Sequence, residues 1–377
     1  MLVDRRRLLA GLAAVPVIRS TPARARSDEA GPAGAVLEAA FATHAPVGLA
    51  GAIIGREGVS WASARGLRSF GDAAPVTTAD SWHLGSNTKA MTAAVFARLV
   101  RQGRARWTMP VGEAFPGIEI DAGWASATLD DFMHHRAGLT DAAVMGREWL
   151  MTARQDPRSL AEQRAAIAAR ALAAPPPGTP GQFAYGNANY VLVGAAIERI
   201  AGEAWEEAMR RELFGPLGLS SAGFGAPRGD NPRGHRGAGA ERTPMPAEHP
   251  GADNPAALGP AGTVHMNLAD YGRFLGAMMG ARPDWLDGDA LARLTTPPAG
   301  DPPAYACGWG VRRQPWGGVS GPGPVLGHDG SNTMWHCSVQ LAPERGVAAV
   351  AVANEGAAGR PACQDLVQRL IGTALSA

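Results

Sequence analysis

Ser86 and Lys89 are the two residues of this chain whose types and spacing most directly suggest chemistry. A serine hydroxyl becomes a strong nucleophile when a base takes its proton, and a partly desolvated lysine amine can act as that base. Apolar residues recur at helical spacing over residues 89–102, and Gly103 follows as a stop, so a helix is predicted. Residues three apart share a helix face, which brings the amine within reach of the hydroxyl. The alternative is a serine helix cap beside a solvated lysine, because this spacing is common by chance.

Two polar residues in a later loop could serve the same reaction. Tyr185 follows a run of prolines and glycines at residues 175–181, which must end the preceding helix and form a stiff loop. A phenol near Lys89 could relay the serine proton and later protonate a leaving group. Asn187 carries both a donor and an acceptor, which suits it to hold Lys89 and a substrate amide carbonyl. The alternatives are a surface or core tyrosine and an ordinary turn asparagine.

A third stretch, residues 328–331, lies where an apolar strand is predicted to end. His328 comes first, and Gly330 would let a substrate backbone approach this strand closely. The alternative for His328 is a histidine at a strand end without a chemical role.

The three stretches together resemble, in order and separation, the active-site motifs of the serine β-lactamase and penicillin-binding-protein superfamily. The resemblance extends over nearly the whole mature chain and is strongest to class C β-lactamases with their esterase and D-peptidase relatives. It implies that Ser86 is the nucleophile and that Lys89 and Tyr185 manage the proton. It also implies that the backbone amides of Ser86 and Ser331 form the oxyanion hole. No cofactor is implied.

One of these motifs departs from the β-lactamase pattern, which has Lys, Thr and Gly where this chain has His328, Asp329 and Gly330. A histidine is only partly charged near neutrality, and Asp329 adds a negative charge, so binding of a penicillin-like carboxylate is disfavoured. We therefore expect an ester or a D-amino-acid amide or peptide as substrate, with a β-lactam as a further candidate. The alternatives are a true β-lactamase, a D-Ala-D-Ala carboxypeptidase, and a non-catalytic cell-wall or antibiotic-binding homologue.

The N-terminus has the features of an export signal over residues 1–25. Three arginines at positions 5–7 precede an apolar run at residues 8–18 and a small-residue cleavage site at residues 23–25. The arginines resemble a twin-arginine signal, which a receptor reads. A bacterial periplasmic or secreted protein is expected. The alternatives are an uncleaved N-terminal anchor and a disordered basic terminus with no role in export.

Composition and net charge limit the kinds of molecule that this chain is expected to bind. The chain has 377 residues, 46% of them hydrophobic and 18% charged, with a formal net charge of +1. Removing residues 1–25 removes five arginines and one aspartate, which leaves a net charge of about −3, so nucleic acid is not expected as a partner. A small-molecule or peptide substrate is expected instead. The sequence does not reveal the oligomeric state.

A metal site is not expected, because His134 and His135 are adjacent and point in different directions on a helix. Both are expected to be structural. The three cysteines, Cys307, Cys337 and Cys363, are too few and too late in the chain for a disulfide framework. Buried thiols are expected, with one disulfide pair as the alternative in an oxidising compartment.

The predicted elements give an α+β fold in which one antiparallel sheet is built from both termini and a helical region is inserted between them. The sheet-containing α/β region is expected at 26–85 and 300–377, and the mostly helical region at 86–299. Within the latter, the Gly/Pro-rich residues 223–262 are expected to form an irregular insertion that covers a site. Strands are predicted at 48–55, 59–64, 307–312, 325–328, 337–341 and 347–352. Helices are predicted at 35–43, 89–102, 128–136, 159–173, 190–200, 205–213, 268–279, 287–294 and 361–374.

Overall fold

The computed structural model describes residues 31–300 and 302–376, so the predicted export signal lies outside the described residues. Within these two ranges, no helix has both the length and the hydrophobicity that a bilayer-spanning segment needs.

A six-stranded antiparallel sheet is the centre of the fold, and both ends of the chain contribute to it. Its order is β2-β1-β11-β10-β9-β8. The strands are β1 (Gly48–Gly55), β2 (Gly58–Gly66), β8 (Gly310–Gln314), β9 (Gly323–Ser331), β10 (His336–Ala342) and β11 (Val347–Ala353). The expected sheet from both termini is therefore confirmed, and β1 has the predicted bounds. Prediction placed the strand before β9 three residues early, because Gly308 has a positive φ of 86° and turns the chain there.

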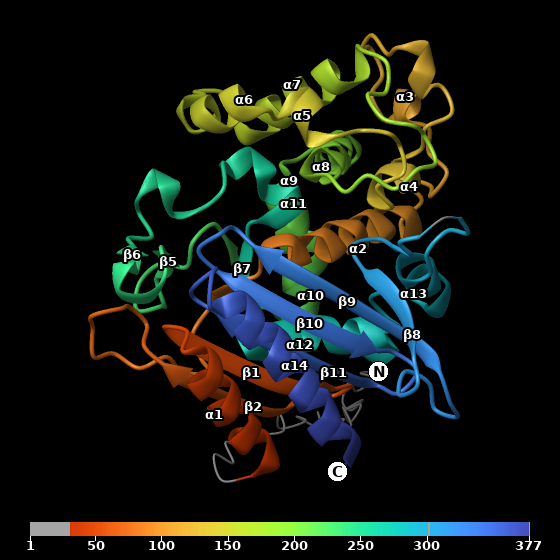
Figure 1. Cartoon of the computed structure of the whole chain (residues 1–377). Coiled ribbons are helices and arrows are strands. Elements are labelled where there is room, and N and C mark those ends of the chain that lie inside the picture. Colours follow the sequence, from red (N-terminus) through yellow and green to blue (C-terminus); the bar gives the residue numbers. More distant parts are fainter. Residues whose placement is uncertain (1–30, 301, 377) are drawn as a thin grey trace, which may run out of the picture.

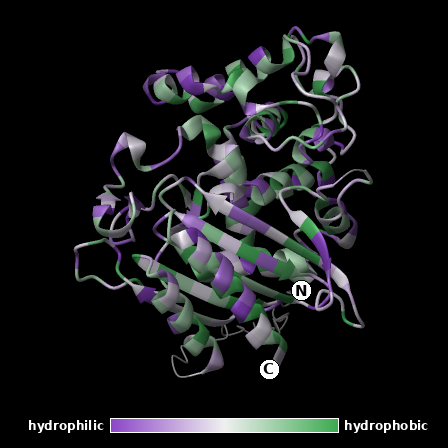
Figure 2. Ribbon diagram, in the orientation of Figure 1, coloured by the Kyte–Doolittle hydropathy of each residue, from purple (hydrophilic) through white to green (hydrophobic). Residues whose placement is uncertain are grey.

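Helices cover the two faces of this sheet. On one face, α1 (Pro32–His44) and α14 (Gly359–Ser376) pack against each other and against the central strands (Figure 1). On the other face, α12 (Leu268–Gly276) packs on β1 and β2. The strand β9 turns hydrophilic toward its end (Figure 2), where His328 and Asp329 leave the core. The edge strand β8 pairs with β9 only as far as Gly327, so the end of β9 extends beyond β8 and contacts residues 85–87 of the helical region.

The helical region is organised around α2 (Thr88–Arg101). The first ten residues of this helix are all buried. Such a helix is buried on every side because α8, α11 and α13 pack around it. The other helices of this region are α3 (Val111–Ala114), α4 (Leu129–Met133), α5 (Asp141–Val144), α6 (Arg147–Thr152), α7 (Leu160–Leu172), α8 (Asn187–Ala201), α9 (Trp205–Met209), α10 (Gly215–Leu217), α11 (Gly259–Gly262) and α13 (Gly288–Thr295).

Local capping chemistry sets several of these helix starts. Thr128 and Asp131 form a reciprocal capping box at α4, and Ser159 and Glu162 form another at α7. Both starts agree with the prediction. The helix α8 begins three residues before the predicted start, at Asn187, for a tertiary reason described below.

The Gly/Pro-rich residues 223–262 are only partly irregular. They contain β4 (Gly223–Phe224), which joins a small sheet with β3 (Trp82–His83) and β7 (Val264–Met266), and the hairpin β5 (Gly234–Arg236) and β6 (Thr243–Met245). Their last four residues form α11 and are all buried against α2 and α8. The prediction of an irregular insertion is therefore wrong for α11, because Gly and Pro permit the close helix packing found there.

The three cysteines are buried and free, as expected for structural thiols. Burial raises the pKa of each thiol well above its ordinary value.

Candidate active site

Ser86 lies half-buried on a single 3-10 turn, Gly85–Asn87, that leads directly into α2. The turn requires a glycine at its start, because Gly85 has a φ of 52°. The Thr88 hydroxyl donates to the Gly85 carbonyl at 2.8 Å and closes the turn. The hydroxyl of Ser86 therefore faces out from a rigid position at the N-terminus of a buried helix.

Lys89 is fully buried one helical turn later, and three oxygen atoms surround its amine. The Nζ atom lies 3.0 Å from Ser86 Oγ, 2.8 Å from Asn187 Oδ1 and 2.8 Å from the carbonyl oxygen of Ala261 in α11. The predicted proximity of the amine and the hydroxyl is therefore present. The Ala261 contact was not predicted, because no side chain signals a backbone carbonyl.

Asn187 is oriented by Asp141, a residue that the sequence analysis missed. The Asn187 amide donates to Asp141 Oδ2 at 3.2 Å, which leaves its Oδ1 facing Lys89. The other carboxylate oxygen accepts the Ala188 amide at 2.7 Å and caps α8. This cap from α5 starts α8 at Asn187 and brings the residue to the site. Because Asp141 takes one amide proton, only the other stays free for a substrate.

Tyr185 covers the buried amine from the solvent side. Its side chain is 46% exposed, and Lys89 Nζ lies 4.9 Å from the centroid of its ring. The phenol makes no hydrogen bond to the described residues. The buried His135 packs beneath the Tyr185 ring at 4.5 Å between centroids and accepts the Gly186 amide at 3.4 Å. His135 is thus a structural support for the tyrosine loop.

His328 reaches the site from β9 and is held by two hydrogen bonds. Its Nδ1 donates to the carbonyl oxygen of Asp329 at 2.7 Å, and its Nε2 accepts the Tyr305 hydroxyl at 3.0 Å. Burial lowers the pKa of His328 to about 4. The expectation of a partly charged histidine is therefore wrong: the imidazole is neutral at pH 7. Tyr305 was not predicted, since only the fold places it beside His328.

Asp329 lies on the opposite face of β9, because successive strand residues alternate between faces. Its carboxylate accepts the Ser338 hydroxyl and the Gln364 amide, each at 2.6 Å, and lies 3.7 Å from His336 Nε2. Burial would raise its pKa, but His336 first, then Ser338 and Gln364, hold the pKa well below the ordinary range. The expected negative charge beside His328 is therefore fixed on the α14 side of the sheet.

Gly330 and Ser331 bring β9 against the Ser86 turn. A Cβ atom at Gly330 would lie 2.9 Å from the Ser86 amide nitrogen, and inside contact distance of the Leu84 carbonyl. A Cβ atom at Gly85 would overlap the Ser331 amide in the same way. The two amides predicted to form the oxyanion hole therefore lie on backbones in direct contact. Gly330 permits this contact between two parts of the chain, whereas the sequence analysis assigned it to substrate approach.

A cavity of about 560 Å³ is lined by Tyr185, His328 and Asp329, whereas Ser86 and Lys89 do not line it. Tyr185, Tyr305 and His328 line one end, and the rest extends over β8, β9 and β10 toward α14. Arg312 on β8 faces this cavity and makes no hydrogen bond or ion pair with the described residues. The cavity is large enough for a small amide, ester or short peptide.

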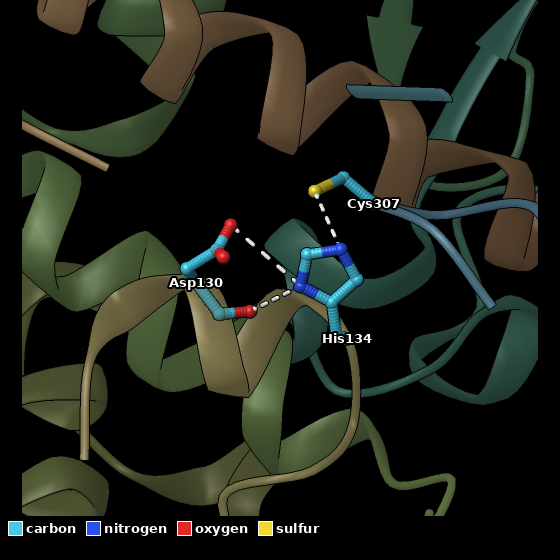
Figure 3. Close-up of side chains that lie close together, drawn as sticks. All are labelled: Asp130, His134 and Cys307. Carbon is cyan, nitrogen blue, oxygen red and sulfur yellow. Dashed lines mark hydrogen bonds and ion pairs between the residues drawn. The ribbon is translucent and has the colours of Figure 1, made fainter. Parts of the chain in front are cut away.

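Asp130, His134 and Cys307 form the one cluster with metal-ligand side chains in the described residues (Figure 3). His134 Nδ1 donates to the Asp130 carbonyl at 2.7 Å, and its Nε2 lies 3.7 Å from Cys307 Sγ. The imidazole thus stands between the other two groups and engages each through a different nitrogen. We interpret the cluster as a buried hydrogen-bonded chain, and the structural role of His134 stays a prediction.

Comparisons with known proteins place this geometry in a family. The family model named Beta-lactamase matches residues 34–373. The chain belongs to the Beta-lactamase family. Penicillin-binding protein 4 of Amycolatopsis lactamdurans is 29% identical over 325 residues, which cover 82% of this chain and 81% of that protein. Unguisins hydrolase ungD of Aspergillus violaceofuscus is 26% identical over 348 residues, or 81% of this chain, but the chain spans only 58% of its length.

The solved structure of a D-stereospecific amidohydrolase from Streptomyces sp. has the same fold. It superposes with a TM-score of 0.68 at 23% identity and covers 89% of this chain and 97% of that one. The predicted superfamily and the α+β, β-lactamase/transpeptidase-like fold are confirmed. The chain is accordingly placed among the serine hydrolases of the β-lactamase and penicillin-binding-protein superfamily.

Proposed function

We propose that this chain is an exported serine hydrolase that cleaves esters and D-amino-acid amides or peptides through an acyl-enzyme on Ser86. The observation that carries the proposal is the environment of Lys89. Its fully buried amine lies 3.0 Å from the Ser86 hydroxyl and between two fixed carbonyl oxygens, those of Asn187 and Ala261.

This environment suits Lys89 to act as a base. A neutral amine has two N–H donors and one lone pair. The carbonyl oxygens of Asn187 and Ala261 accept the two donors, so the lone pair is directed at the Ser86 proton. Ser86 can then attack a carbonyl carbon while Lys89 takes its proton. The family relationship supports this division of roles.

Tyr185 and the two backbone amides complete the proposed mechanism. Tyr185 covers Lys89 and is exposed to the cavity, so it can pass the proton to the leaving group. The amides of Ser86 and Ser331 lie on contacting backbones and can stabilise the tetrahedral oxyanion, an effect worth a few kcal/mol for each donor. Water then attacks the acyl-enzyme and releases the acid.

The neutral His328 favours substrates without a carboxylate next to the scissile bond. A lysine at this position would supply a fixed positive charge, whereas His328 with a pKa of about 4 accepts a hydrogen bond from Tyr305. The names of two relatives, a hydrolase of unguisins and a D-stereospecific amidohydrolase, support an amide or peptide substrate. A true β-lactamase or a D-Ala-D-Ala carboxypeptidase is the alternative.

Intact-mass measurement after incubation with a fluorophosphonate tests the proposal. We expect one adduct on the wild type, none on Ser86→Ala, and an unchanged adduct on the control Ser60→Ala, which alters an exposed serine on β2. An adduct that persists on Ser86→Ala would contradict the assigned nucleophile. No adduct on the wild type would favour a non-catalytic binding protein.

Export is tested by the intact mass of the protein recovered outside the cytoplasm. Signal cleavage should reduce this mass by about 25 residues.

A further inference from the structure

Asp253 is a buried carboxylate behind the Ser86 turn that the proposed mechanism does not use. It lies in the Gly/Pro-rich segment between β6 and α11, and its side chain is 9% exposed. Its two oxygen atoms point to two different parts of the chain. Oδ2 lies 2.9 Å from His83 Nε2, and Oδ1 accepts the Asn332 amide at 2.8 Å.

The first of these bonds leads to the nucleophile. His83 on β3 has no exposed side-chain surface, and its Nδ1 accepts the Gly85 amide at 3.1 Å. An Nδ1 atom that accepts a proton donor carries no hydrogen, so the neutral imidazole must carry its hydrogen on Nε2. Asp253 is the acceptor for that hydrogen. The carboxylate therefore selects the tautomer that can hold the backbone one residue before Ser86.

The second bond leads to the other side of the proposed oxyanion hole. Asn332 directly follows Ser331 and is 6% exposed. Its Nδ2 donates to Asp253, and its Oδ1 accepts the Met334 amide at 3.2 Å. The Asn332 side chain thus bridges the carboxylate and the loop that follows β9.

We propose that Asp253 is a positioning residue that fixes the Ser86 and Ser331 amides relative to each other through His83 and Asn332. The two backbones touch at Gly85 and Gly330, and contact alone stops them from moving together but not apart. Asn87 Nδ2 already donates to the Cys337 carbonyl on β10 at 3.5 Å. The Asp253 carboxylate adds a second restraint, with a hydrogen bond toward each backbone. The inference rests on the proposed acyl-enzyme function, since the alignment matters only when an oxyanion forms.

Asp253→Asn tests this role with a side chain of the same shape. The amide has one oxygen and one N–H₂ group. If its oxygen takes the place of Oδ1, which also accepts the Asn254 amide at 2.7 Å, the bond from His83 Nε2–H is lost; in the other orientation the bonds from Asn332 and Asn254 are lost. Acylation by a p-nitrophenyl ester should fall about 10- to 100-fold in kcat with little change in KM. Removing one oxyanion-hole donor lowers kcat by roughly 10²–10³-fold. The expected loss is smaller here because the substitution displaces the donor and does not remove it.

A thionoester provides the readout that separates positioning from folding. Sulfur accepts hydrogen bonds poorly, so a displaced oxyanion hole should slow the oxygen ester more than the matching thionoester. The oxygen-to-sulfur rate ratio should therefore fall in Asp253→Asn and in Asn332→Ala. The control is Asp270→Asn in α12, outside the site. Asp270 is 1% exposed, and its carboxylate accepts the Ser221 amide at a distance of 2.7 Å. This variant should keep the wild-type ratio.

Two outcomes would overturn the inference. One is an unchanged kcat in Asp253→Asn. The other is a loss of activity in which the oxygen-to-sulfur ratio stays at the wild-type value, as a purely structural defect would give. A wild type that forms no acyl-enzyme would instead contradict the proposed function itself.

Discussion

The charge of His328 affects which substrates the site can bind. A histidine in place of the family's lysine was evident from the sequence, but its charge was not. In the folded protein, burial holds the pKa of His328 at about 4, and Tyr305 donates to its Nε2 at 3.0 Å. The site therefore presents a hydrogen-bonded neutral ring where a penicillin carboxylate would need a cation.

This difference predicts the substrate preference. Wild type should cleave p-nitrophenyl esters and D-alanyl amides faster than a chromogenic cephalosporin. The variant His328→Lys should raise the cephalosporin-to-ester ratio of kcat/KM about 10-fold, because a charge-assisted hydrogen bond contributes about 1.5–3 kcal/mol. The panel is measured at pH 7, with thermal unfolding to confirm that the variant folds. A wild type that cleaves the cephalosporin fastest would show that the neutral histidine does not set the preference.

At the scale of elements, the site depends on how closely β9 approaches the turn before α2. Gly330 has no side chain at the point of contact, and a Cβ atom there would lie 2.8 Å from Asn87 Nδ2 and inside contact distance of the Leu84 carbonyl. The strand and the turn must therefore pack backbone to backbone. The geometry of the oxyanion site is set by this contact between elements far apart in the sequence.

Gly330→Ala should accordingly impair both stability and turnover. The added methyl group forces β9 away from the turn, and overpacking of this kind costs about 1–3 kcal/mol. Urea unfolding should show that loss, and ester turnover should fall further than the stability loss explains. The control Gly55→Ala adds a methyl group at the end of β1, where the nearest atom is 4.0 Å away. Equal effects of the two substitutions would argue against a specific contact at Gly330.

At the scale of the whole molecule, several buried histidines couple folding to pH. Burial lowers the pKa values of His135, His235, His265 and His328 below the ordinary value of 6.5. Between pH 6.5 and the lowered folded-state values, the unfolded chain binds protons that the folded chain does not. The free energy of unfolding is therefore fully retained above about pH 6.5 and decreases as the pH falls through this window.

We expect the free energy of unfolding to fall from pH 6.5 to 5.5 by at least about 1.4 kcal/mol, the value for one proton per pH unit. Burial raises the pKa values of the Asp130 and Glu198 carboxyls, so protonation of these two groups stabilises the folded state as the pH falls. Their ordinary pKa values lie below that of histidine, so the histidines dominate between pH 6.5 and 5.5. Urea unfolding at half-unit pH steps measures the slope, and His265→Gln should reduce it. A flat profile over this range would contradict the prediction.

The sequence by itself determined the features that depend on local chemistry. The capping boxes at Thr128 and Ser159 start helices where expected, because their hydrogen bonds close within four residues. The first strand, Gly48–Gly55, follows its apolar pattern to the residue. The Ser86–Lys89 proximity likewise follows from helical periodicity. The three motifs in order were enough to predict the family.

Only the tertiary structure decided how these motifs are held together. Asp141, Tyr305 and the Ala261 carbonyl contact the predicted residues from segments far along the chain, and none carries a local signal. Asp253 lies in a segment that was predicted to be irregular, yet its carboxylate connects to both sides of the oxyanion site. The physical reason is that burial and long-range hydrogen bonding depend on which distant segments pack together. Those same contacts set the charge of His328 and the orientation of Asn187.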